Sequence, residues 1–292
     1  MTGGSIPPGL NNVFSSMTIT SSSNLQHCES EATELAGFID DHPRLTILTG
    51  AGISADSGIP TYRDDRGRWL PATPIQHQEF LTDPHKRQRY WSRSLRGWPA
   101  VRDARPNGAH LAIAELERLG AVVLLITQNV DRLHQRAGST RVVDLHGRLD
   151  RVVCLDCNQR LPREQVQHTL RALNPSLCHV DGPSLPDGDA DVADAVVAQV
   201  CVPDCPACAG ILMPDVVFFG GTVPKPRVHR CMDAIEASDA LVIIGSSLKV
   251  ISGFRFCRRA SELNKPIVLI NPGATRADTL AQHKFTSNSA TL

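Results

Sequence analysis

Residues 46–63, TILTGAGISADSGIPTYR, decide the fold of this chain. An apolar run ends at Gly50 and Gly52, and Ala55 supplies the third small residue of a G-x-G-x-x-A pattern. Glycines at a strand end let the backbone turn tightly and approach a pyrophosphate, whose charge the N–H groups of a helix start can bind. Because glycine-rich strand ends also occur for turn geometry alone, the stretch by itself leaves nucleotide binding open.

A dehydrogenase of this type would carry an acidic residue about 20 positions further on, where it binds the ribose hydroxyls. That neighbourhood reads RWLPATPIQ and contains no acid. A simple hydride-transferring oxidoreductase is therefore disfavoured.

Four largely apolar runs, at 44–49, 121–127, 239–245 and 265–271, are bounded by glycine or polar residues. This is typical of strands buried on both faces of a parallel sheet. Helical patterns lie between them, at 107–120 and 229–239. The alternation predicts an α/β fold with a Rossmann-like, doubly wound parallel sheet.

Two stretches interrupt this alternation: residues 64–105, rich in Arg and Trp, and residues 148–213, rich in Cys, Pro and Asp. We expect them to form a small helical, zinc-binding domain. Residues 32–63, 106–147 and 214–292 then make a discontinuous Rossmann-like domain. Residues 1–31, rich in Ser, Thr, Asn and Gly, are expected to be a disordered tail.

The composition limits the partners. The 292-residue chain is 41% hydrophobic and has a formal net charge of zero. Nothing in that balance favours nucleic acid or an anionic membrane, so a small or peptide-like substrate is expected. No apolar run is long enough to span a bilayer, and the first lysine or arginine is Arg44, which argues against a secretory signal or an arginine-rich presequence. We expect a cytoplasmic protein.

Two C-x-x-C pairs mark a metal site. Cys154 with Cys157 and Cys205 with Cys208 provide four thiolates, which fill the tetrahedral shell of a structural zinc ion. The gap between the pairs is longer than in usual zinc ribbons, and Cys178 and Cys201 are alternative ligands. A nucleic-acid-binding ribbon is disfavoured because the insert DGPSLPDGDADVADAVV is acidic.

Six motifs occur in order: GAGISADSGIPTYR, TQNVDRLHQRAG (127–138), LHG (145–147), PDVVFFG (214–220), GSS (245–247) and NPG (271–273). Together they resemble the sirtuin family of NAD-dependent protein deacylases, over residues 32–292. Within that family, PIQH, RQRYWSRSLRGWP and LDRVVCLDC are most similar to the class II branch that includes the mitochondrial lipoamidase and ADP-ribosyltransferase type.

The resemblance implies NAD as cofactor and acyl-lysine proteins or peptides as substrates. The sequence does not determine the oligomeric state, and a monomer is favoured. In the family's reaction the acyl-lysine carbonyl oxygen attacks the anomeric carbon of the nicotinamide ribose. A base then deprotonates a ribose hydroxyl so that it attacks the imidate carbon. His146 matches that base, and Asn129 positions the groups that displace nicotinamide. A mono-ADP-ribosyltransferase and a non-catalytic NAD-sensing or zinc interaction module remain as alternatives.

The resemblance assigns NAD contacts to the strand ends and to a loop, Tyr62 and Arg63, that closes over NAD. Asp131 has the alternative role of a helix cap. The expected contacts are Gly50, Ala51, Gly52, Ser54, Asp56, Thr61, Tyr62, Arg63, Gln128, Asn129, Asp131, Gly245, Ser246, Ser247, Asn271, Pro272, Gly273 and Ser289. The chain stops at SNSATL, so the adenine side near Ser289 is expected to be shorter than in relatives.

Tyr90 and Arg93 lie three residues apart and share a face if they are helical. By resemblance to class II enzymes that remove acidic acyl groups, they bind a carboxylate at the end of the acyl chain. The alternative is a solvated arginine on an amphipathic helix. Val217, Phe218, Phe219 and Gly220 resemble the edge strand that pairs with the substrate backbone, and a buried core strand is their alternative.

Overall fold

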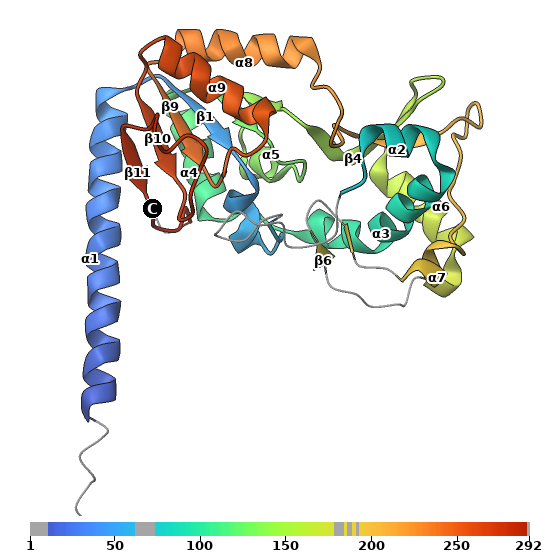
Figure 1. The fold of residues 1–292 in the computed structure, drawn as a ribbon, viewed down its shortest axis with the longest axis horizontal. Coiled ribbons are helices and arrows are strands. Elements are labelled where there is room, and N and C mark those ends of the chain that lie inside the picture. Colours follow the sequence, from blue (N-terminus) through green and yellow to red (C-terminus); the bar gives the residue numbers. More distant parts are fainter. Residues whose placement is uncertain (1–10, 62–73, 178–183, 186–188, 191–192, 291–292) are drawn as a thin grey trace, which may run out of the picture.

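The structure, a computed structural model, describes residues 11–61, 74–177, 184–185, 189–190 and 193–290. Its centre is a six-stranded parallel sheet (Figure 1) in the order β11-β10-β9-β1-β2-β3. The strands are β1 (Leu45–Thr49), β2 (Val122–Thr127), β3 (Val142–Asp144), β9 (Ala240–Ile244), β10 (Ile267–Ile270) and β11 (His283–Phe285). This order confirms the doubly wound fold, and the direction of winding reverses between β1 and β9.

Helices cover both faces of the sheet. One face packs against α8 (Lys225–Ala237) and α9 (Ile251–Glu262), and the other against α1 (Asn11–Asp41) and α4 (Gly108–Arg118). In β1, Leu48 belongs to the first core and Ile47 to the second, and both are almost completely buried. Two buried faces explain why the strand is a nearly continuous apolar run.

A smaller part lies beside the sheet (Figure 1) and is built on an antiparallel sheet in the order β5-β4-β8. Its strands are β4 (Gly147–Cys154), β5 (Arg160–Pro162) and β8 (Leu212–Val216), with the short pair β6 (Ser184–Leu185) and β7 (Asp189–Ala190). Its helices are α2 (His77–Thr82), α3 (Pro84–Asp103), α6 (Arg163–Leu173), η2 (Pro175–Leu177) and α7 (Asp194–Val197). Its core centres on Trp91, and the buried guanidinium of Arg163 lies 5.3 Å from that ring.

The N-terminal region differs from the sequence-based expectation. Residues 11–31, predicted as disordered, lie in α1, which ends at Asp41. The stretch from Asn11 to Ala36 contains neither glycine nor proline, so no residue in it interrupts a helix. The buried side chain of Phe38 anchors the C-terminal end of this helix on the core. The predicted boundary at residue 32 therefore falls inside a helix.

The C-terminal end of α1 is tied to the end of β11. The carboxylate of Glu31, which is buried, accepts hydrogen bonds from the backbone N–H groups of Thr286 (2.8 Å) and Ser287 (2.9 Å). The Glu34 carboxylate lies 2.5 Å from Nδ1 of His283. Among the helices of the described residues, none is long and apolar enough to cross a membrane.

Two histidines are buried between α4, α5 (Leu133–Ala137) and β1. Their rings, His110 and His134, lie 4.7 Å apart, and His134 Nε2 lies 2.9 Å from Oγ1 of Thr49. Burial lowers the pKa of His110 to about 4. Burial and the neighbouring His110 lower the pKa of His134 to about 3. Both rings are therefore neutral in the folded protein at neutral pH.

Because both histidines are buried and neutral, we expect the stability of the folded protein to decrease in acid. An unfolded histidine titrates near pH 6.5, so between that pH and about pH 4 the unfolded state binds protons that the folded state excludes. The contribution of these neutral rings to the unfolding free energy is fully present above about pH 6.5, and it is lost as the pH falls. We expect the unfolding free energy from urea titrations to decrease from about pH 7 to about pH 5.5, and His110→Gln to remove about 1 kcal/mol of that decrease.

The control is His168→Gln, because His168 is exposed and no comparable burial acts on its ring. This variant should retain the full decrease. An unchanged decrease in His110→Gln would contradict the role assigned to the buried ring.

Candidate functional site

A cavity of ≈ 1170 Å³ opens at the carboxyl edge of the parallel sheet. Four strand ends contribute to its wall: Gly50 after β1, Gln128 after β2, Gly245 after β9 and Asn271 after β10. The strand order reverses between β1 and β9, and open α/β sheets bind ligands at such a point.

The glycines at this edge are needed where two loops touch. A Cβ on Gly52 would lie 2.8 Å from Cα of Gly245, and Gly52 N–H donates to the Gly245 carbonyl at 2.8 Å. Gly245 has φ +61°, and a Cβ there would lie 2.3 Å from the backbone nitrogen of Ile53. The first turn of η1 (Ala51–Ser57) therefore packs directly on the end of β9, and side chains at either glycine would separate them.

Most of the predicted contact residues line this one cavity. Those on the wall are Gly50, Ala51, Gly52, Asp56, Thr61, Tyr90, Arg93, Gln128, Asn129, His146, Val217, Phe218, Phe219, Gly220, Gly245, Ser246, Ser247, Asn271, Pro272, Gly273 and Ser289. Tyr62 and Arg63 lie outside the described residues. Ser54 and Asp131 are not on the wall.

Ser54 and Asp131 instead support Asn129 from behind. The Ser54 hydroxyl donates to the Asp131 carboxylate (2.7 Å) and accepts from Nδ2 of Asn129 (3.0 Å), which also donates to the Gly50 carbonyl (3.1 Å). Asp131 also accepts from the N–H of Leu133, the first residue of α5, as the helix-cap alternative predicted. Burial raises the pKa of Asp131. With both Nδ2 protons donated, Asn129 retains its carbonyl oxygen as an acceptor for a ligand.

The tautomer of His146 follows from its two neighbours. Nδ1 lies 3.0 Å from the backbone carbonyl of Gln128, and a carbonyl can only accept, so Nδ1 carries the proton. Burial and the charge of Arg227 lower the pKa of His146 to about 4, although the bond to Gln128 opposes this shift. The ring is therefore neutral at pH 7, and Nε2 has a lone pair that can accept a proton. These are the requirements for a general base.

Sequence reasoning missed Ser252, whose hydroxyl lies 2.7 Å from Nε2 of His146. Ser252 is in the first turn of α9 and lines the cavity. A polar residue at a helix start, just beyond the carboxyl end of β9, is the signal that could have identified it.

The smaller part supplies the opposite wall. Tyr90 of α3 packs its ring on Phe80 (5.5 Å between centroids) and on Phe218 (5.4 Å), and Arg93 is 6% exposed. Arg93 is thus not a solvated arginine on an amphipathic helix. Tyr90 and Arg93 both lie in α3 and both line the cavity.

The predicted edge strand is only partly regular. β8 ends at Val216, and beyond it Val217 N–H donates to the His146 carbonyl (2.7 Å), while the Phe219 carbonyl accepts from His77 N–H (2.7 Å). Some backbone groups of this stretch are therefore engaged within the chain. At the other end of the cavity, Ser289 lines the wall and Asn288 donates to the Asp56 carboxylate (2.7 Å).

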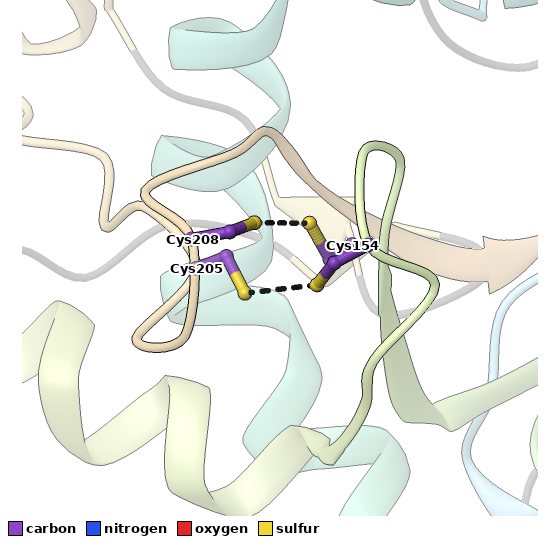
Figure 2. Close-up of side chains that lie close together, drawn as sticks. Cys154, Cys205 and Cys208 are labelled. Carbon is purple, nitrogen blue, oxygen red and sulfur yellow. Dashed lines mark hydrogen bonds between the residues drawn. The ribbon is translucent and has the colours of Figure 1, made fainter.

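The two C-x-x-C pairs form one cluster (Figure 2), with all four sulfurs within 4.8 Å of one another. Cys154 Sγ lies 3.5 Å from Cys208 Sγ, and Cys157 Sγ lies 3.7 Å from Cys205 Sγ. Four sulfurs bound at about 2.3 Å to a tetrahedral zinc ion would be about 3.8 Å apart. The four residues therefore fit a structural zinc ion, and Cys201, an alternative ligand, lies outside the cluster. Cys178, the other alternative, lies outside the described residues.

The backbone of the two pairs follows the same turn. The Cys154 carbonyl accepts from Asn158 N–H (3.0 Å), and the Cys205 carbonyl accepts from Ala209 N–H (2.8 Å). Asn158 and Ala209, each directly after the second cysteine, have φ of +60° and +58°. Two equivalent turns thus aim two pairs of sulfurs at one point.

The chain is similar to members of one family in sequence and in structure. The sequence model of the Sir2 family matches residues 50–252. The "NAD-dependent protein deacetylase" of Xanthomonas campestris pv. campestris (strain 8004) is 50% identical over 256 residues, which are 88% of this chain and 87% of that protein. The protein of the same name from Bordetella bronchiseptica is 50% identical over 251 residues, 86% of this chain and 92% of that protein.

Among solved structures, the one described as "Sir2-p53 peptide-NAD+" matches with a TM-score of 0.71 and 28% identity, covering 88% of this chain and 93% of that chain. A "Sir2 homolog-NAD complex" matches with a TM-score of 0.67 and 33% identity, covering 88% of this chain and 89% of that chain.

The cysteine cluster predicts one zinc ion per chain. We expect Cys208→Ser to lose the metal and to lower the urea midpoint strongly, because structural zinc contributes about 10 kcal/mol or more of apparent binding energy to folding. Cys201→Ser, a matched change at an exposed cysteine outside the cluster, should retain the metal and the midpoint. Elemental analysis of the purified variants provides the measurement, and equal loss of zinc from both would contradict the assignment.

Proposed function

The chain belongs to the Sir2 family, and we propose that it is an NAD-dependent protein lysine deacylase, which transfers the acyl group of acyl-lysine to ADP-ribose and releases nicotinamide. The observation that carries this proposal is the state of His146. Its imidazole is neutral, carries its proton at Nδ1 and lies on the wall of the cavity at the carboxyl edge of the sheet. The relatives named as deacetylases and the Sir2 structures described with NAD and peptide support it.

NAD, when bound, supplies the ribose whose anomeric carbon accepts the acyl oxygen as nicotinamide leaves. We assign the dinucleotide to the strand ends, where Gly50, Gly245 and Asn271 leave room for phosphates and riboses. Asn129, fixed through Ser54, orients the groups near the reacting carbon. His146 takes the proton of a ribose hydroxyl at Nε2. Most of the rate enhancement then comes from orientation and correct protonation.

Acyl specificity and cellular location are further parts of the proposal. Arg93 lies buried beside Tyr90 at the end of the cavity that the smaller part forms, which supports an acyl chain with a terminal carboxylate and the class II branch.

A cluster of four cysteine thiols is typical of a reducing compartment, which supports a cytoplasmic location.

Turnover of an acyl-lysine peptide panel tests the activity, with acetyl, succinyl, glutaryl, methylglutaryl and lipoyl groups. We expect removal of at least one acyl group, strictly dependent on NAD and accompanied by O-acyl-ADP-ribose. His146→Ala should lower this rate by about 100-fold or more because the general base is lost. His168→Ala, at an exposed position, is the matched control and should retain the rate.

ADP-ribose on protein without peptide cleavage would instead indicate the mono-ADP-ribosyltransferase, and NAD binding without nicotinamide release would indicate a non-catalytic module.

Arg93→Ala tests the acyl pocket. Loss of a charge-assisted hydrogen bond should lower kcat/KM for succinyl- or glutaryl-lysine by about 10- to 100-fold, corresponding to about 1.5–3 kcal/mol, and should change acetyl-lysine turnover little. Steady-state kinetics on matched peptides give the ratio. Equal losses on charged and uncharged acyl groups would contradict the carboxylate-binding role.

A further inference from the structure

Both ring nitrogens of His146 have partners. Nδ1–H donates to the Gln128 carbonyl, so the hydroxyl of Ser252, 2.7 Å from Nε2, must be the donor of that second hydrogen bond. The lone pair that the proposed function needs as a base is therefore covered by a serine hydroxyl. A substrate hydroxyl reaches it either by displacing Ser252 or by passing its proton through Ser252.

The contact is built into the packing of α9. A Cβ on Gly253 would lie only 2.6 Å from Nε2 of Gln128, so the first turn of α9 lies directly against that side chain. The other end of the same amide is held, because Ser246 Oγ donates to Oε1 of Gln128 at 2.6 Å. Gln128 thus contacts His146 through its carbonyl and the first turn of α9 through its side chain, which fixes Ser252 relative to the imidazole.

The location of Ser252 also suits proton transfer. Ser252 and His146 both line the cavity, so a ligand can contact the hydroxyl. α9 runs from Ile251 to Glu262, and Ser252 lies in its first turn, where the helix dipole is positive. That field stabilises negative charge on the serine oxygen at the moment its own proton moves.

We propose that Ser252 is a proton-relay residue between the substrate ribose hydroxyl and His146. This inference rests on the proposed deacylase function. The ribose O–H bond breaks and its proton forms a new O–H bond to Ser252 Oγ, while the original serine proton moves to Nε2. Serine ends neutral and the imidazole carries one positive charge. The electron pair left on the ribose oxygen forms the bond to the imidate carbon, and the π pair of that carbon's C=N bond moves onto the lysine nitrogen. No oxidant or reductant takes part.

Ser252→Ala removes the relay, and Ser261→Ala is the matched control, an exposed serine on the same helix. We expect single-turnover deacylation to fall by about 10- to 100-fold in Ser252→Ala. Exchange of labelled nicotinamide into NAD, which precedes the base-dependent step, should be retained. Ser252→Thr, which keeps the hydroxyl, should restore most of the rate.

A proton inventory in mixtures of H₂O and D₂O separates a relay from a structural role. Two protons in flight give a curved plot of rate against deuterium fraction for the unmodified protein, and one proton gives a straight line for Ser252→Ala. An unchanged or faster deacylation in Ser252→Ala, or parallel loss of deacylation and nicotinamide exchange, would overturn the relay. So would identical proton inventories in the two proteins.

The inference remains testable if the deacylase proposal fails. The ¹⁵N resonance of His146 Nε2, measured without substrate in labelled protein, should shift between the unmodified chain and Ser252→Ala because a hydrogen bond to the lone pair is lost. An unshifted resonance would overturn the contact itself. Absence of acyl-lysine turnover in the unmodified chain, together with a shifted resonance, would overturn the proposed function and with it the relay, while the hydrogen bond would stand.

Discussion

The contact between the backbones of Gly52 and Gly245 is the constraint on which the rest of the site depends. It places the turn after β1 directly on the end of β9, across the point where the winding of the sheet reverses. Ser54 follows within the same turn and fixes Asn129. Any side chain at this contact would displace the turn, and with it the hydrogen bonds behind the cavity wall.

Strand β4 joins the chemistry of the cavity to the metal cluster. It begins at Gly147, directly after His146, and ends at Cys154. Eight residues of extended strand span about 26 Å. One rigid element therefore carries the imidazole at one end and a zinc ligand at the other, so the metal can stabilise the position of the base without contacting the substrate.

The sequence predicted the elements that are buried on both faces. β1, β2, β9 and β10 lie within one or two residues of the predicted runs, because continuous apolar stretches are a strong signal. β3 and β11 have three residues each, too few for a pattern. α1 was missed because its first half is rich in Ser and Thr, which are weak helix formers.

Motifs located most of the cavity wall, because the ends of parallel strands meet at one edge regardless of their distance in sequence. Individual hydrogen bonds were not predictable in this way. The contact between Ser252 and His146 joins residues 106 positions apart, and it depends on the path of α9 over Gln128. The position of Asp131 was not predictable from its motif either. It depends on the hydrogen bond with Ser54, which holds Asp131 behind the cavity wall.

The carboxylate of Glu31 makes α1 and the segment after β11 a single mechanical unit. Its two backbone hydrogen bonds reach Thr286 and Ser287, only two residues before Ser289 on the cavity wall. Opening of the helix at this point would break both bonds and remove one of the supports of the segment that carries Ser289. The local stability of α1 therefore contributes to the stability of one end of the cavity wall.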